Sequence, residues 1–317
     1  MIYLILVVSL IGIVLGADWL VSGSVSIAKR LKVSEFVIGA AIVGVGTSMP
    51  ELLVSFIGAL QGNSDVAIGN VAGSNIFNVL GILGLTAAFF PIAIDKANMR
   101  FEIPYCIFVS IILTLMAFNF FVTDTPVIGR IDGLLLLILF AIFMWYSFHR
   151  DSKQKAGITE TRQDTPDNSK EKPVWMAIAT VTVGLAVLIT SCDIFVDKAV
   201  QIAKNWGMSE AVISITLIAC GTSLPELAAS IAAAIKKNTL MALGNIIGSN
   251  IFNISLILGL SSQVTPLTSA GITLTDYLVM IGVALLTLLF GIRGRIDRAS
   301  GLFMVACFIA YNIFLLN

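Results

Sequence analysis

The sequence predicts an all-α integral membrane protein with ten transmembrane helices, arranged as two inverted five-helix repeats. Three observations predict this fold: the composition, the number of long apolar runs, and a pair of motifs that occurs twice. The 317 residues are 57% hydrophobic and 12% charged, with a mean hydropathy of +0.98. Such values are typical of a membrane protein and not of a soluble domain.

Ten apolar runs are long enough to cross a hydrocarbon layer of about 30 Å. The first run lacks the basic segment and the small-residue cleavage site of a signal peptide, so we expect it to remain as a span. The predicted spans are residues 2–25, 35–60, 66–90, 101–121, 128–148, 174–197, 209–235, 240–262, 275–292 and 300–316.

Basic residues predict the orientation of these spans. When the spans alternate across the membrane, 16 of the 19 lysines and arginines fall on one side, and only Arg130, Lys198 and Lys204 fall on the other. The positive-inside rule then places both termini outside and the polar stretch after the fifth span in the cytoplasm. We therefore predict a multi-pass protein of the cell (inner) membrane, with a disordered linker between its halves.

The internal repeat divides the chain. GTSMPELLVS at 46–55 recurs as GTSLPELAAS at 221–230, and GNVAGSNIFN at 69–78 recurs as GNIIGSNIFN at 244–253. Each half holds five spans, so the second half must start from the opposite face, as in many secondary transporters. The predicted parts are the first repeat (1–148), the cytoplasmic linker (149–173) and the second repeat (174–317).

The repeated motifs place a proline and a glutamate in the middle of a span. Pro50 and Pro225 each remove a helical hydrogen bond and free carbonyl oxygens in the preceding turn. In a bilayer such oxygens need protein, water or an ion as a partner. Glu51 and Glu226 each cost about 2.5–3.5 kcal/mol at mid-membrane depth, and no lysine or arginine lies there to neutralise them. The missing partner is most simply a cation.

Neutral oxygens accompany the two glutamates. A threonine lies one helical turn before each of them, and polar side chains recur every four residues along the third and eighth spans. Two carboxylates among neutral oxygens suit Ca²⁺ or Na⁺, whereas Mg²⁺ needs a stricter octahedron. Scattered cysteines and the lack of a mid-span histidine argue against a thiolate metal site. The neutral residues are Thr47, Thr222, Asn70, Ser74, Asn78, Asn245, Ser249 and Asn253.

Several other residues are assigned structural roles. Glycines spaced by four residues in the same motifs are expected to let helices approach closely. Ser34 and Ser209 are interpreted as helix N-caps. Three aspartates near predicted span ends, and His149, are interpreted as interfacial residues. These glycines are Gly69, Gly73, Gly244 and Gly248, and the aspartates are Asp18, Asp193 and Asp197.

At these motifs the chain resembles the sodium/calcium exchangers of the calcium:cation antiporter superfamily. GTS(M/L)PE followed by GxxxGSN, present twice, is the specific signal, and the resemblance covers almost the whole chain. It implies an antiporter and no enzyme, in which Na⁺ entry drives Ca²⁺ out as the first and sixth spans move across the other eight. It implies Ca²⁺ and Na⁺ as substrates, no cofactor, a lipid bilayer as surroundings, no nucleic acid and no obligate protein partner.

The resemblance also implies a set of cation ligands. Some relatives carry aspartate where this chain has Asn253, and its amide favours K⁺-independent exchange. The implied Ca²⁺ ligands are Glu51, Glu226, Thr47 and Thr222, completed by Asn78 and Asn253 at the centre. The implied Na⁺ ligands are Ser48, Ser74, Ser223 and Ser249, with the carbonyls near Gly44 and Ala219.

Other functions remain open from the residues alone. Carboxylates carry H⁺ as well as metal ions, so a proton-coupled Ca²⁺ antiporter is the nearest alternative. A cation channel or a non-transporting membrane scaffold would show no dependence on a counter-ion.

Overall fold

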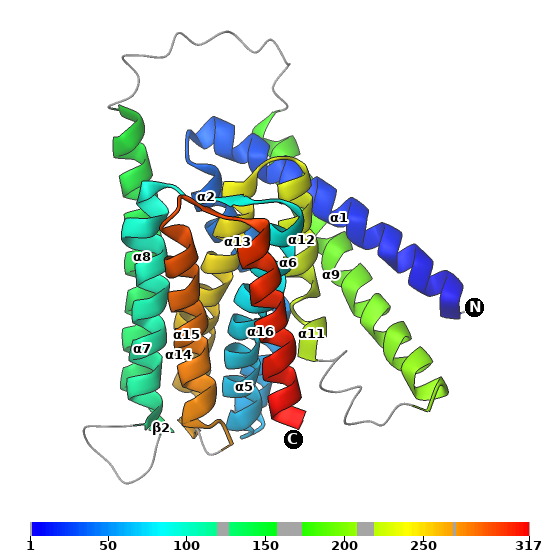
Figure 1. Ribbon diagram of the computed structural model, residues 1–317, viewed down its shortest axis with the longest axis vertical. Coiled ribbons are helices and arrows are strands. Elements are labelled where there is room, and N and C mark those ends of the chain that lie inside the picture. The colour runs from blue at the N-terminus through cyan, green and yellow to red at the C-terminus, as the bar shows by residue number, and fades with distance from the viewer. Residues whose placement is uncertain (1, 119–126, 157–172, 208–218, 269–270, 317) are drawn as a thin grey trace.

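The computed structural model describes residues 2–118, 127–156, 173–207, 219–268 and 271–316. They form a bundle of upright helices with two long helices leaning against one side (Figure 1). The α-helices are α1 (Ile2–Leu31), α2 (Glu35–Ile38), α3 (Val45–Thr47), α4 (Met49–Leu60), α5 (Ser64–Ile76), α6 (Gly84–Phe89), α7 (Ile103–Phe118), α8 (Arg130–Ala156), α9 (Val174–Asn205), α11 (Ala219–Gly221), α12 (Leu224–Ile235), α13 (Thr239–Phe252), α14 (Leu258–Val264), α15 (Leu274–Gly291) and α16 (Arg298–Leu316). Wider π-helical turns are η1 (Gly39–Gly44), η2 (Phe77–Leu83), η3 (Asn98–Glu102) and η5 (Asn253–Ile257).

The predicted all-α membrane fold is confirmed. In the described part of the chain eight helices are long and apolar enough to cross a bilayer, and the bent pair Glu35–Thr47 and Met49–Leu60 gives a ninth. The predicted span 209–235 falls partly outside the described residues, and its described part is α11 and α12. The cap predicted at Ser34 is confirmed, because its hydroxyl accepts from the backbone N–H of Val37. The cap predicted at Ser209 lies outside the described residues.

Three predicted boundaries are wrong. α1 continues to Leu31 and α9 to Asn205, past the predicted ends at 25 and 197, because both helices lean across the bundle (Figure 1). A tilted helix needs more residues to cross the same thickness. α8 continues to Ala156, so the beginning of the predicted 149–173 linker is helical. Residues 157–172, to which the prediction of disorder also applies, lie outside the described residues.

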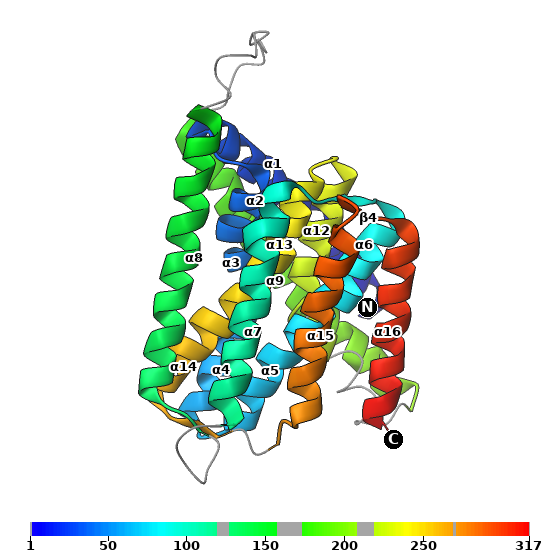
Figure 2. The same cartoon turned by 60° about the vertical axis from the view of Figure 1, so that its left-hand side comes forward.

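α1 and α9 lie against each other through glycines. A Cβ atom at Gly16 would lie 2.6 Å from the backbone nitrogen of Leu188, and one at Gly184 would lie 2.6 Å from that of Leu20. Small residues at such a crossing let two membrane helices make backbone contact. The pair therefore forms one layer beside the remaining helices (Figures 1 and 2).

Two short strand pairs join the first half of the chain to the second. β1 (Ile92–Ala93) pairs with β4 (Arg295–Ile296), and β2 (Val127–Ile128) pairs with β3 (Leu267–Thr268), both antiparallel. Figure 2 labels β4 near the upper end of the bundle, and Figure 1 labels β2 at the lower end. The two halves are thus tied together at both ends.

The close approach predicted at the motif glycines is confirmed in the second half of the chain only. A Cβ atom at Gly248 would lie 2.5 Å from Cα of Ala40, and one at Gly244 would clash with the carbonyl oxygen of Phe36. Gly73, in contrast, lines a cavity, and no atom of the described residues lies within 4 Å of a Cβ atom built there. The prediction for Gly73 is wrong in this conformation because the helices around α5 leave that space open.

Candidate cation-binding site

Each proline breaks its helix where the sequence predicts. Ser48 separates α3 from α4, and Thr222 and Ser223 separate α11 from α12. The φ, ψ angles are −83°, 10° at Ser48 and −91°, 10° at Ser223. The two parts of the first of these broken spans, Glu35–Thr47 and Met49–Leu60, meet at a 49° bend. Glu51 and Glu226 consequently lie in the first turn of α4 and α12, where unpaired backbone N–H groups favour negative charge.

The two glutamates are buried and bonded across the halves of the chain. Glu51 is 1% exposed and Glu226 is 0% exposed. The hydroxyl of Ser48 donates to Oε1 of Glu226 at 2.7 Å, and the hydroxyl of Ser223 donates to Oε1 of Glu51, also at 2.7 Å. The two carboxylates also interact electrostatically with each other. One centre therefore contains both repeated motifs.

Two asparagines hold the backbone of the broken helices in place. Nδ2 of Asn70 donates to the carbonyl oxygen of Glu51 at 3.2 Å, and Nδ2 of Asn245 donates to that of Glu226 at 3.1 Å. Oδ1 of Asn245 also accepts from the hydroxyl of Thr47 at 3.2 Å. These amides satisfy carbonyls close to the proline breaks, so they position the glutamates.

Five buried oxygens of this centre have no hydrogen-bond partner among the described residues. They are Oε2 of Glu51, Oε2 of Glu226, Oγ1 of Thr222, Oδ1 of Asn78 and Oδ1 of Asn253. No lysine, arginine or histidine side chain in the described ranges is buried. A buried, unpaired carboxylate is strongly unfavourable unless an opposite charge compensates it. Hard carboxylate and amide oxygens match the ligands of Ca²⁺.

The other predicted ligands lie around the same centre. Oγ of Ser74 accepts from Ser223 at 3.2 Å, and the side chains of Thr47 and Thr222 lie beside Glu226 and Glu51. The predicted carbonyl at Gly44 already accepts from the N–H of Ser48 at 3.0 Å and from the hydroxyl of Ser249 at 3.3 Å. Ala219 begins α11, next to the described part of the second motif.

Sequence reasoning missed Asn75 and Asn250. Both are buried, and each donates from Nδ2 to the backbone carbonyl of the other, at 3.2 Å in both directions. The available signal was the last letter of the repeated GSN, which recurs beside serines that were selected. Hydropathy and spacing alone do not separate an amide that faces a cation from one that faces another amide.

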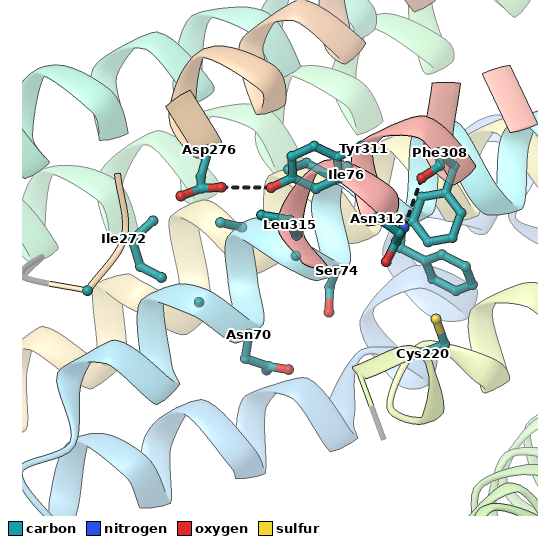
Figure 3. Close-up of a pocket in the computed structure, with 15 residues that line it drawn as sticks. Asn70, Ser74, Ile76, Cys220, Ile272, Asp276, Phe308, Tyr311, Asn312 and Leu315 are labelled. Carbon is teal, nitrogen blue, oxygen red and sulfur yellow. Dashed lines mark hydrogen bonds between the residues drawn. The ribbon is translucent and has the colours of Figure 1, made fainter. Parts of the chain in front are cut away.

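A cavity of about 510 Å³ leads away from the centre along α5. It extends from Asn70 and Ser74 to Asp276, Tyr311 and Leu315, and Cys220 lies on its wall (Figure 3). The hydroxyl of Tyr311 donates to Asp276 at 2.8 Å. The cavity joins predicted site residues to the end of the bundle where the C-terminus lies (Figure 1).

A second cavity, of about 360 Å³, lies between α9 and the two broken helices. Pro50, Thr222 and Asp193 are among the residues that line it. Asp193 was expected at the membrane interface, but α9 continues twelve residues past it to Asn205. This aspartate therefore faces a cavity next to a motif threonine.

The helix bundle and its buried, oxygen-lined, anionic centre define a membrane transporter of hard cations. Residues 1–149 and 176–317 match the sequence profile described as sodium/calcium exchanger protein. The chain belongs to the sodium/calcium exchanger family and is an antiporter of Na⁺ and Ca²⁺.

Individual relatives span the whole chain. CaxA of Alkalimonas amylolytica is 38% identical over 97% of both chains. Sodium/calcium exchanger MaX1 of Methanosarcina acetivorans is 32% identical over 99% of this chain and 98% of its own. A solved structure of the sodium-calcium exchanger NCX_Mj, soaked with zero Na⁺ and Ca²⁺, is similar with a TM-score of 0.83 and 33% identity, over 99% of this chain and 100% of that one.

Proposed function

We propose that one shared site holds either Ca²⁺ or Na⁺ and that Na⁺ entry drives Ca²⁺ out of the cell. The observation that carries this proposal is the set of five buried oxygens without partners, two of them on carboxylates. Both ions are hard cations that bind such oxygens, so they compete for them. Competition for one site that faces the two sides of the membrane in turn produces exchange.

The proposed ligands divide between the two ions. Ca²⁺ binds between the two glutamates, where Asn78 and Asn253 contribute neutral oxygens and neighbouring threonines complete the shell. Na⁺ positions flank it. The proposed Ca²⁺ ligands are Glu51, Glu226, Asn78, Asn253, Thr47 and Thr222, and the proposed Na⁺ ligands are Ser48, Ser74, Ser223, Ser249 and the carbonyls of Gly44 and Ala219.

The proposed alternation of access is a movement of α1 and α9 across the other helices. Their arrangement as a separate layer supports it, and so does an asymmetry between the halves. Nζ of Lys236, at the end of α12, lies 2.6 Å from Oδ1 of Asp18 in α1 and also bonds to Ser22. The repeat-related Asp193 instead lines a cavity. An ion pair at Asp18 thus holds α1 to α12, whereas the corresponding aspartate of α9 lies at a cavity.

Vesicle transport tests the proposal. Purified protein in proteoliposomes is given an imposed Na⁺ gradient, an imposed pH gradient, or neither, and the uptake of radioactive Ca²⁺ is followed. We expect uptake driven by Na⁺. Uptake driven by the pH gradient alone would identify a proton-coupled antiporter, and uptake that needs no counter-ion would identify a channel.

The proposed topology places the larger cavity at the extracellular face and both termini outside. Cys220 lies on the cavity wall and is partly exposed, whereas Cys106 is buried. In a variant whose other three cysteines are alanine, we expect a membrane-impermeant cationic thiol reagent to label Cys220 and block transport from outside only. A variant that keeps only Cys106 is the control and remains unlabelled. Labelling of Cys220 exclusively from the cytoplasmic side would reverse the topology.

The amide at Asn253 predicts exchange that needs no K⁺. Nδ2 of Asn253 donates to Oδ1 of Asn75 at 3.0 Å. In Asn253→Asp the introduced carboxyl can make this bond only when protonated, and the two glutamates favour its protonated form. We expect the variant to resemble the wild type at low pH and to depart from it, or to require K⁺, as the pH rises. Ca²⁺ flux in proteoliposomes with K⁺ or choline over a pH series measures this. Wild-type flux that stops without K⁺ would contradict it.

A further inference from the structure

Four buried asparagines, on helical segments that pack against α4 and α12, form a continuous chain of hydrogen bonds. Asn75 and Asn78 come from α5 and η2, and Asn250 and Asn253 come from α13 and η5. Nδ2 of Asn78 donates to Oδ1 of Asn250 at 2.9 Å, and Nδ2 of Asn253 donates to Oδ1 of Asn75 at 3.0 Å. Every one of these bonds joins one half of the chain to the other.

Backbone carbonyls fix the direction of this chain. A carbonyl oxygen can only accept, so the nitrogen of Asn75 must face the carbonyl of Asn250, and the nitrogen of Asn250 must face that of Asn75. The Oδ1 atoms of these two residues are thereby aimed at Asn253 and Asn78. Because these Oδ1 atoms can only accept, Asn253 and Asn78 must each turn their Nδ2 toward them. The Oδ1 atoms of Asn253 and Asn78 therefore point away from Asn75 and Asn250.

We infer that Asn75 and Asn250 are positioning residues for the cation site, each setting the orientation of one ligand amide in the other half of the chain. This inference rests on the proposed function, in which Asn78 and Asn253 are ligands. Their Oδ1 atoms are the amide oxygens that lack a hydrogen-bond partner among the described residues. Without the acceptors on Asn75 and Asn250, either ligand amide can turn and present its NH₂ group, which repels a cation.

Both proposed ligand amides lie at the beginning of a π-helical turn. η2 begins at Phe77, just before Asn78, and η5 begins at Asn253. A π-helical turn carries one extra residue and shifts the side chains that follow it, and such turns are frequent at functional sites. Asn75 and Asn78 both donate to Asn250, and Asn78 in addition keeps an oxygen without a partner.

The test is a pair of crossed double-mutant cycles on the Ca²⁺ concentration for half-maximal Na⁺-driven uptake. Asn75→Ala and Asn250→Ala are each expected to raise it about fivefold in the wild-type background, the size of one hydrogen bond's orienting effect. In Asn253→Asp, measured at a pH high enough to ionise the introduced carboxyl, both terminal atoms are equivalent acceptor oxygens, so orientation no longer matters. There Asn75→Ala should change the value less than twofold, while Asn250→Ala keeps its full effect. In the Asn78→Asp background the reverse is expected: Asn250→Ala should change the value less than twofold, while Asn75→Ala keeps its full effect.

Asn75→Ala could instead raise the half-maximal Ca²⁺ concentration by the same factor in the wild-type, Asn253→Asp and Asn78→Asp backgrounds. That result would show that Asn75 acts through packing only and would overturn the inference. Asn78→Ala and Asn253→Ala test the ligand proposal separately. If both leave Ca²⁺ binding unchanged, the proposed site itself fails. Where a variant transports too slowly, equilibrium binding of radioactive Ca²⁺ to the purified protein gives the same comparison, and size-exclusion chromatography verifies that the variant is folded.

Discussion

Glu51→Gln and Glu226→Gln are each expected to abolish Na⁺-driven Ca²⁺ uptake while leaving the protein folded. Glutamine keeps the size of the side chain and the oxygen that accepts from serine, at 2.7 Å in both cases. It replaces the oxygen that has no partner with an NH₂ group. Losing one charge of a buried ion pair costs about 3–5 kcal/mol, which is a factor of at least a hundred in cation affinity.

Glu102→Gln is the matched control. Glu102 is also buried, at 4% exposure, but it lies in η3, outside the proposed centre. We expect this variant to keep its uptake. Ca²⁺ flux in proteoliposomes measures uptake by all three variants, and thermal melting in detergent verifies that they are folded. Near wild-type transport by either of the other two variants would rule out a shared carboxylate site.

Gly248→Ala is expected to lower the stability of the protein by about 1–3 kcal/mol, as overpacking of a close contact does. The added Cβ atom would lie 2.5 Å from Cα of Ala40, and backbone of η1 and α13 must separate to relieve it. The same movement would displace Ser249, whose hydroxyl donates to the carbonyl of Gly44. Both the melting temperature in detergent and the rate of Ca²⁺ uptake are therefore expected to fall.

Gly282→Ala provides the comparison for this prediction. Gly282 lies in α15, and no atom of the described residues is within 4 Å of a Cβ atom built there. Alanine favours helix more than glycine does, so this variant should melt at the same temperature or slightly higher. If Gly248→Ala and Gly282→Ala have the same melting temperature, α13 and η1 are not in tight contact.

Local sequence predicted most of the fold and the two buried glutamates on which the proposed site depends. A long apolar run predicts a membrane span, and a proline within the run predicts where the helix is broken. Both breaks occur at the serine two residues before the proline. A glutamate after each proline, with no basic residue at the same depth, was enough to predict a cation centre at Glu51 and Glu226.

Features that depend on contacts between distant residues could not be predicted, because sequence patterns reflect only a few neighbouring positions. Hydropathy gives the length of a span only for an upright helix, so the ends of the leaning α1 and α9 were missed. The repeat makes Gly73 and Gly248 equivalent, yet in the structure Gly73 lines a cavity whereas Gly248 packs against Ala40. Symmetry in sequence does not require symmetry in any one state of a transporter.

The sequence by itself determined that this chain is a helical membrane protein with two copies of a broken, acidic span, because composition, periodicity and proline act over a few residues. Only the tertiary structure decided which oxygens remain free. Ser48 bonds to Glu226 across 178 positions of the chain, and Asn75 bonds to Asn253 across the same separation. Such contacts depend on how the two halves pack, and packing alone leaves Oδ1 of Asn78 without a partner while Oδ1 of Asn75 accepts from the other half.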